Sequence, residues 1–415
     1  MQTRPQDRNE QAVKESLFSR FAPSLTFLKE STSALLITII TTSLAGLFLS
    51  SYREFFLLLP GLIILVPGAV DMRGTIFGAM GARLGSAFHL GELEKITWKN
   101  EIIRKNTYSS ILLSIFLPIM LAVLAKLISI SFGIQSISVF QFIEIAFISS
   151  MISAGAMILV SFSIYEVASK KGWDPDNVTA PAITSMGDLI TIPSLLVAGT
   201  LVLRLNPYVN WMAHATIIGA VILFMLTLQT KKDYRKLVLQ ALLILPFIAL
   251  VEICSGVMLE SYLERLAVIP ATLILLPTFL GEGGNIGSIF ASRLATSLHL
   301  GMTEPNYKMD KGTRRNLLNV FILCLIIFPA AGAAAHFLGG LFGLAGTNLL
   351  TLVLVSLTAG IILISVITMI VFGMAVFFYK KSVDPDNVLI PLLTAFADVF
   401  GVFCLLLVLG LFGII

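Results

Sequence analysis

Charged residues are scarce in this sequence. Asp, Glu, Lys and Arg together make up 13% of its 415 residues, against about a quarter in an average globular chain. Hydrophobic residues make up 57%, more than a soluble domain of this size could hide. Apolar runs of 18 residues or more recur along the chain, and each can cross a ~30 Å hydrocarbon core as a helix. The composition therefore excludes an ordinary soluble protein and predicts an all-α integral membrane protein.

Cysteine is also scarce. The three cysteines, Cys254, Cys324 and Cys404, lie in apolar segments without CxxC spacing, which argues against a disulfide framework and a zinc site. The net charge is +4, and the basic residues sit in short loops between apolar runs. The positive-inside rule explains that placement better than a nucleic-acid partner does. Residues 1–30 are polar and mixed in charge, so we expect a cytoplasmic tail there and no cleavable signal peptide.

The apolar runs predict eleven helices. Two of them, at about 54–90 and 264–300, are too long for one plain span and have Pro- and Gly-rich middles. We expect both to be broken there, because unwound backbone is tolerated at membrane depth where it lines a cavity or packs on protein. The other nine are predicted at about 31–51, 107–131, 139–170, 178–204, 208–230, 238–260, 315–345, 349–380 and 387–413.

The chain also repeats itself at a fixed offset of 210 residues, without a gap over more than a hundred residues. The matched pairs include Pro67 and Pro277, Arg83 and Arg293, Thr184 and Thr394, and Asp188 and Asp398. This pattern predicts a duplication. The expected domains are the tail at 1–30, a transmembrane repeat at 31–205, a linker helix with its loop at 206–236, and a second repeat at 237–415.

The linker helix sets the orientation of the two repeats. Five predicted helices precede it and five follow it, so it returns the chain to its starting side and makes the repeats parallel. Of the 28 Lys and Arg residues, 21 fall on one face of this arrangement. The asymmetry predicts a cytoplasmic N-terminus and an extracellular C-terminus in the plasma membrane. Parallel repeats related by a pseudo-twofold axis along the membrane normal are a known transporter plan.

Asp188 and Asp398 are the first candidates for a metal site. Each lies about ten residues into its helix, or roughly 15 Å deep, near the bilayer midplane. A carboxylate there costs at least ~2.5 kcal/mol and normally faces a bundle interior. Two carboxylates that meet there would repel unless a cation lay between them, although a protonated, hydrogen-bonded Asp is the structural alternative. Thr184 and Thr394, one turn earlier, either ligate the cation or bond to their own helix.

The Pro- and Gly-rich middles supply further candidates. Glycines allow close backbone approach and unwound carbonyls, and Asp, Glu and Asn offer hard oxygen ligands for a cation. A close-packed seam between helices is the competing explanation, and it is stronger for the glycines than for the two carboxylates. The residues expected to line the path or support its ligands are Asp71, Thr75, Glu282, Gly283, Gly284 and Asn285.

Four more carboxylates stand at the predicted cytoplasmic mouth: Asp174, Asp176, Asp384 and Asp386. The Asp-Pro-Asp-Asn motif that holds them is first of all typical of a helix N-terminus. At that position the same side chains could also collect cations.

Taken as a paired set, these motifs resemble the MgtE family of magnesium channels and transporters. The resemblance is to the internally duplicated branch, which includes animal solute carriers and lacks the cytoplasmic regulatory domains of bacterial members. It rests on Pro-x-x-x-Gly-x-Gly-Gly-Asn-x-Gly from Pro277 and on the Asp-Pro-Asp-Asn block ending at Asp398. The family pattern implies that the Asp of the fifth helix binds hydrated Mg²⁺. One departure is Arg73-Gly74-Thr75 where the second copy has Gly283-Gly284-Asn285, so the halves are unequal.

The expectation is therefore a transporter and not an enzyme. The resemblance implies Mg²⁺ as the transported ion, passing between the repeats, with no organic cofactor. The expected partners are the lipid bilayer and divalent cations, and the expected assembly is a monomeric pseudo-dimer. A Na⁺- or H⁺-coupled cation exchanger is the alternative. An intramembrane aspartyl protease is a remote one, because such enzymes use two different Asp motifs and here one motif is repeated.

Overall fold

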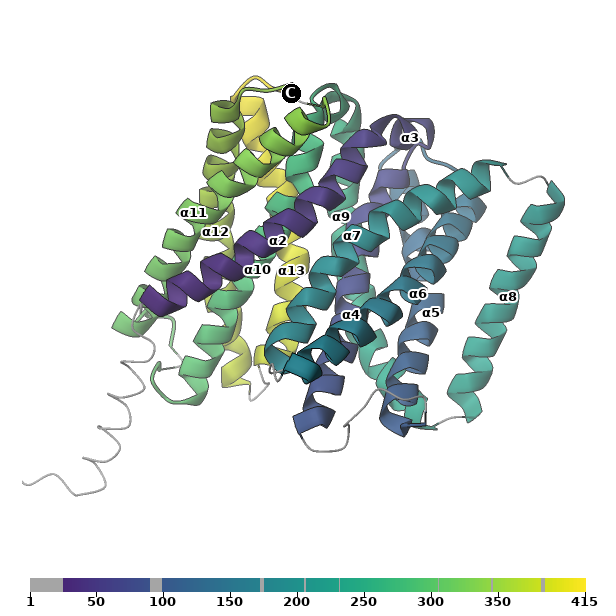
Figure 1. Cartoon of the computed structure of the whole chain (residues 1–415), viewed down its shortest axis with the longest axis horizontal. Helices are drawn as coiled ribbons and strands as arrows, with labels where there is room; N and C mark the ends of the chain where they lie inside the picture. Colours follow the sequence, from purple (N-terminus) through teal and green to yellow (C-terminus); the bar gives the residue numbers. More distant parts are fainter. Residues whose placement is uncertain are drawn as a thin grey trace, which may run out of the picture. The chain divides into compact units, whose positions relative to one another are not determined.

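The structure is a computed structural model that describes residues 25–89, 99–171, 175–204, 207–230, 232–304, 306–344, 346–381 and 385–415. All regular structure in these residues is helical, as Figure 1 shows. Eleven helices in the described part are long and apolar enough to cross a membrane, which confirms the predicted class. They are α2 (Leu25–Ser51), α4 (Leu65–His89), α5 (Glu101–Ser131), α6 (Val139–Lys171), α7 (Pro175–Arg204), α8 (Pro207–Thr230), α9 (Lys232–Val268), α10 (Pro270–His299), α11 (Lys311–Leu341), α12 (Leu349–Lys380) and α13 (Pro385–Leu411).

The predicted breaks in the two long helices are in the wrong place. α10 is unbroken through Pro277 and the glycines after it, and α4 is unbroken from Leu65 onward. The chain breaks earlier, where α3 (Arg53–Leu58) and the short helix η1 (Leu62–Ile64) precede α4, and between α9 and α10. Gly61 takes φ 83° at the first break, a conformation that favours glycine. Pro67 lies in the first turn of α4, where its missing N–H costs no helical bond.

The helices form two compact units of contacts. One unit holds the described residues from Leu25 to Ile39 with those of Phe279–Ala334 and Leu349–Ile414, and there α12 packs along α13. The other holds Ile40–Thr278 and Ala335–Asn348, and there α4 packs on α5, α6, α7 and α9. The boundaries fall inside α2, α10 and α11, so the units are clusters of contacts and not separate stretches of chain. The repeat boundaries stay predictions from the sequence.

The outward side chains of the spans are apolar. Ile37, Leu159 and Met369 are 64%, 69% and 72% exposed, and many other leucines, isoleucines and phenylalanines are exposed alongside them. Lipid covers such surfaces without cost. The helices also bury hydroxyls, and several of these bond to a carbonyl one turn earlier in the same helix, as Thr191 does to Gly187 at 2.7 Å.

Two glycines permit backbone-to-backbone contact in the larger unit. A Cβ on Gly46 of α2 would stand 2.3 Å from the carbonyl oxygen of Ile274 in α10. A Cβ on Gly256 of α9 would stand 2.3 Å from the carbonyl oxygen of Ile64, just before α4. Gly46 and Gly256 are 210 residues apart in the sequence, and so are Ile64 and Ile274. The first helix of each predicted repeat therefore packs on the second helix of the other, through the same contact.

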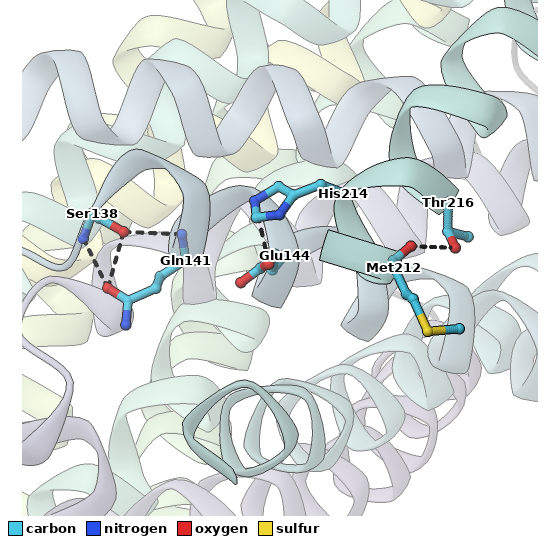
Figure 2. Close-up of polar contacts among 6 residues, drawn as sticks. All are labelled: Ser138, Gln141, Glu144, Met212, His214 and Thr216. Carbon is cyan, nitrogen blue, oxygen red and sulfur yellow. Dashed lines mark hydrogen bonds and ion pairs between the residues drawn. The ribbon is translucent and has the colours of Figure 1, made fainter. Parts of the chain in front are cut away.

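The linker helix α8 is the least enclosed span, with 11% of its most apolar window buried. It docks on its neighbours through a few specific contacts. Phe224 stacks on Phe116 of α5, with ring centroids 5.0 Å apart. His214 of α8 points at Glu144 of α6, with Nε2 and Oε1 3.4 Å apart, as Figure 2 shows. Glu144 is only 2% exposed, and the two facing atoms make no hydrogen bond in the described structure, so the contact is an ion pair when His214 is protonated.

His214→Ala should lower the stability of the protein by about 1–3 kcal/mol, because it leaves the buried Glu144 carboxylate without its facing group. Thermal unfolding of the purified chain measures the loss. Thr216→Ala on the same helix is the matched control, since the Thr216 hydroxyl bonds only to Met212 of its own helix, at 2.8 Å (Figure 2). Equal unfolding midpoints for the two variants would refute a docking role for His214.

Candidate functional site

Small residues bring α4 and α7 close together at the depth of the predicted metal site. A Cβ on Gly74 would lie 3.0 Å from Cγ2 of Thr184, and one on Gly78 would lie 3.2 Å from its hydroxyl oxygen. On α7, a Cβ on Gly187 would lie 3.4 Å from the backbone nitrogen of Gly74. The two helices thus meet through glycines and one threonine, as small-residue seams in membranes do.

This contact places two carboxylates near each other. Asp188 follows Gly187 on α7, and its charge interacts with that of Asp71 on α4. Both side chains are half-buried, and Thr184 lies one helical turn before Asp188. We refer to Asp71, Thr184 and Asp188 as the first half-site. Two like charges in apolar surroundings repel, and a cation between them removes the repulsion.

The corresponding contact recurs between α10 and α13 in the other unit. A Cβ on Gly284 would lie 3.7 Å from Cγ2 of Thr394, and these residues are 210 positions after Gly74 and Thr184. Asp398 is half-buried one turn beyond Thr394. We refer to Thr394 and Asp398 as the second half-site. The equivalence of the two contacts extends the duplication from the sequence to the packing of side chains.

The carboxylates of α4 and α10 are not equivalent. The counterpart of Asp71 is Gly281, and the counterpart of Glu282 is Met72. One residue corresponds to about 100° around a helix, so the two carboxylates point in different directions. Glu282 is fully buried and accepts a hydrogen bond from the Thr38 hydroxyl of α2 at 2.5 Å. The structure therefore places Glu282 against α2, whereas Asp71 lies beside its Asp partner.

Gly283 and Gly284 are both helical, and Gly283 is closely packed. A Cβ on Gly283 would lie 2.6 Å from Leu363 of α12. Their carbonyls belong to the unbroken α10, so the expected unwound ligands are not formed. The contact at Gly283 fits the seam explanation, and Gly284 makes an ordinary contact with Thr394 at 3.7 Å. Thr75 and Asn285 occupy equivalent positions, one residue further along, and both are half-buried.

The predicted mouth is only partly described. Asp174 and Asp384 lie outside the described residues, and the side chains of Asp176 and Asp386 do as well. The backbone of α7 begins at Pro175 and that of α13 at Pro385, directly after the two undescribed aspartates. Both helices therefore start within the Asp-Pro-Asp-Asn motif, three and two residues before the predicted starts at about 178 and 387.

The structure buries two charged residues that were not among the predicted site residues. Glu252 of α9 is fully buried, and its Cβ lies 3.5 Å from the position of a Cβ on Gly68 of α4. Its repeat counterpart is Thr42, which is why the duplication did not point to it. Arg73 of α4 is 2% exposed and donates hydrogen bonds to Ser114 of α5 and Ser150 of α6, at 2.8 and 2.5 Å. For both residues, the sequence signal was a charged side chain inside a predicted span.

The ligand chemistry of the half-sites suits a hard and hydrated cation. Within the described ranges, no group of three or more His, Cys, Asp or Glu residues could hold a metal ion on its own. Transition metals in proteins usually take several side-chain ligands. Mg²⁺ keeps much of its water and uses one or two carboxylates, which each half-site can supply.

Comparison with known proteins finds one family model matching the chain twice, once in each predicted repeat. The family model MgtE, described as a divalent cation transporter, matches residues 66–198 and again 276–408. Solute carrier family 41 member 3 of Mus musculus is 21% identical, over 86% of this chain and 77% of its own length. Solute carrier family 41 member 2 of Gallus gallus is 26% identical, over 95% and 72%, and the Homo sapiens member 2 is 25% identical, over 86% and 65%. No solved structure matches this chain.

Proposed function

Because the chain belongs to the MgtE family of divalent cation transporters, we propose that it carries Mg²⁺ across the membrane between its two repeats, with Asp188 and Asp398 both binding the ion. The observation that carries this proposal is the repeated contact between a glycine and a threonine. It sets each Asp one turn beyond a threonine that packs on the second helix of its own repeat. Equivalent carboxylates at equivalent depth are what a shared ion requires.

The proposed ion stays partly hydrated. Stripping water from Mg²⁺ is costly, and one or two carboxylates with bound waters are its usual protein environment. Asp188 and Asp398 supply the charge, and the hydroxyls of Thr184 and Thr394 bind the ion or its waters. The cost of two carboxylates at membrane depth is then offset by the cation that they hold.

In this proposal the two repeats contribute different groups to the ion path. Asp71 adds a second carboxylate to the first half-site, because its charge acts on Asp188. Glu282 is held by Thr38 and supports α10 instead. Thr75 of the first repeat and Asn285 of the second line the path, so one repeat offers it a hydroxyl and the other an amide.

The membrane orientation is part of the same proposal. The N-terminus is cytoplasmic, and the chain lies in the plasma membrane, on the evidence of the basic residues in its loops. The carboxylates Asp174, Asp176, Asp384 and Asp386 then surround the cytoplasmic mouth. There they raise the local concentration of cations.

Purified protein in liposomes that hold a Mg²⁺-sensitive dye tests the function. Wild-type protein should give Mg²⁺ influx, and the double variant Asp188→Asn with Asp398→Asn should give none above protein-free liposomes. Glu101→Gln is the control, since this exposed carboxylate at the start of α5 pairs only with Lys105, at 2.9 Å. Undiminished flux in the double variant would overturn the proposal. Repeating the assay under imposed Na⁺ or H⁺ gradients separates conduction from coupled exchange.

A further inference from the structure

Arg73 sits in the interior of the larger unit without a charged partner. Its guanidinium donates to the hydroxyls of Ser114 and Ser150, and its Nε has no hydrogen-bond partner. Among the residues that the structure describes, no carboxylate lies within ion-pair distance of it. Arginine stays protonated in proteins. A full positive charge is therefore buried at membrane depth against neutral groups alone, which costs several kcal/mol.

A small cavity adjoins this guanidinium. Its polar lining consists of Arg73, Ser149, Ser150 and Thr191, and the rest of the wall is mostly apolar. The free space accepts about one particle of the size of water. Ser149, Ser150 and Thr191 are each no more than 2% exposed, so the cavity lies inside the protein.

The second repeat lacks every polar part of this arrangement. The counterpart of Arg73 is Gly283, where a Cβ would lie 2.6 Å from Leu363. The counterpart of Ser150 is Gly360, where a Cβ would lie 2.3 Å from the ring of Phe328. The counterparts of Ser114, Ser149 and Thr191 are Cys324, Ala359 and Gly401.

A guanidinium and four surrounding hydroxyls are thus present together in one repeat and absent together from the other. Chance loss of single polar groups would not remove all five positions at once. The pattern indicates one polar site that belongs to the first repeat, and apolar packing that replaces it in the second.

We propose that this cavity binds a small monovalent anion of halide size, chloride under physiological conditions. The anion neutralises the Arg73 guanidinium and accepts a hydrogen bond from the Ser149 hydroxyl. Charge-assisted bonds of this kind are about twice as strong as neutral ones, which favours an anion over a water molecule in the same space. Larger anions such as gluconate and sulfate do not fit a cavity of this size.

The nearby carboxylates are compatible with this occupant. Asp71 precedes Arg73 by two residues, which turns it about 200° around α4, away from the cavity. Asp188 lies about one turn before Thr191 on α7. An Arg73 guanidinium neutralised by the anion adds no net charge to its surroundings. The anion site is separate from the half-sites, and it does not depend on the identity of the transported cation.

Thermal unfolding of the full chain without Mg²⁺ tests the site. Sodium chloride or bromide should raise the midpoint by about 2 °C over sodium gluconate of equal ionic strength, at tenfold the half-saturating concentration. Bromide should also give an anomalous scattering peak beside Arg73 in crystals of the protein. Ser149→Ala, which copies Ala359 of the second repeat, should lower the halide affinity about tenfold.

The control is Ser163→Ala on the same helix, since the Ser163 hydroxyl is exposed and bonds only to Leu159, at 2.8 Å. It should leave the halide response unchanged. Arg73→Met should abolish the response while keeping the bulk of the side chain, and if it does not fold, Ser149→Ala decides. Equal midpoints in chloride and gluconate, or a halide shift in Ser149→Ala equal to that of the wild type, would mean that water alone occupies the cavity and would overturn the proposal.

Discussion

Leucine in place of Gly46 or Gly256 is expected to prevent the chain from folding. In each case the new side chain meets a backbone carbonyl, because a Cβ alone would already lie 2.3 Å from the oxygen of Ile274 or Ile64. A flexible side chain can move aside, but a helix backbone cannot do so without losing its own bonds. The cost exceeds the ~1–3 kcal/mol of ordinary overpacking. The yield of monodisperse protein in detergent and its unfolding midpoint measure the effect.

Matched controls exist elsewhere in the same bundle. Gly155 of α6 and Gly373 of α12 lie within helices and have no atom within 4 Å of a Cβ position. Leucine at either should leave the yield close to that of the wild type. Equal behaviour of Gly46→Leu and Gly256→Leu is also expected, since the two contacts are the same contact repeated. A folded Gly46→Leu protein with an unchanged midpoint would show that α2 does not pack on α10 in this way.

A single Asn at either Asp188 or Asp398 is expected to reduce Mg²⁺ flux about 100-fold. The ion loses one of the two charged ligands that the proposal gives it, and a charged hydrogen-bonding partner contributes roughly 3 kcal/mol. Asp71→Asn should have a smaller effect, about tenfold, because Asp71 acts beside Asp188 and has no counterpart in the second repeat. Initial rates of dye signal in liposomes measure all three.

The relative losses of Mg²⁺ flux in these three variants distinguish a shared site from a site in one repeat. Equal losses for Asp188→Asn and Asp398→Asn, with a smaller loss for Asp71→Asn, fit one ion shared by two unequal halves. A large loss in only one of the two single variants would assign the ion to one repeat and would refute the shared site.

Much of this fold follows from the order of residues. Apolar runs give the spans because only a helix satisfies its backbone within lipid. α7 and α13 start at Pro175 and Pro385, inside the Asp-Pro-Asp-Asn motif and two or three residues before the predicted starts, because proline suits the first helical position. The breaks were misplaced because glycine and proline weaken a helix only where no neighbour holds it. Here Leu363 and Thr394 pack against Gly283 and Gly284 and keep them helical.

The candidate site, like the fold, is predictable from the sequence only in part. Asp188 and Asp398 stand out in the sequence because a carboxylate within a span is rare and because the 210-residue offset pairs them. The proximity of Asp71 to Asp188 and the turn of Glu282 toward Thr38 depend on which face each helix presents. The hydroxyls around Arg73 come from positions 41 and 77 residues away. Serine in a helix is too common for its sequence alone to reveal such a partner.

The stoichiometry of divalent cation binding tests the central claim most directly. Mn²⁺ can stand in for Mg²⁺ in equilibrium binding to the detergent-solubilised chain, with free Mn²⁺ counted by electron paramagnetic resonance. A site shared by the two repeats predicts one tightly bound Mn²⁺ per wild-type chain, and the loss of that ion in both Asp188→Asn and Asp398→Asn. Two tightly bound ions in the wild type, with one retained in each single variant, would contradict it.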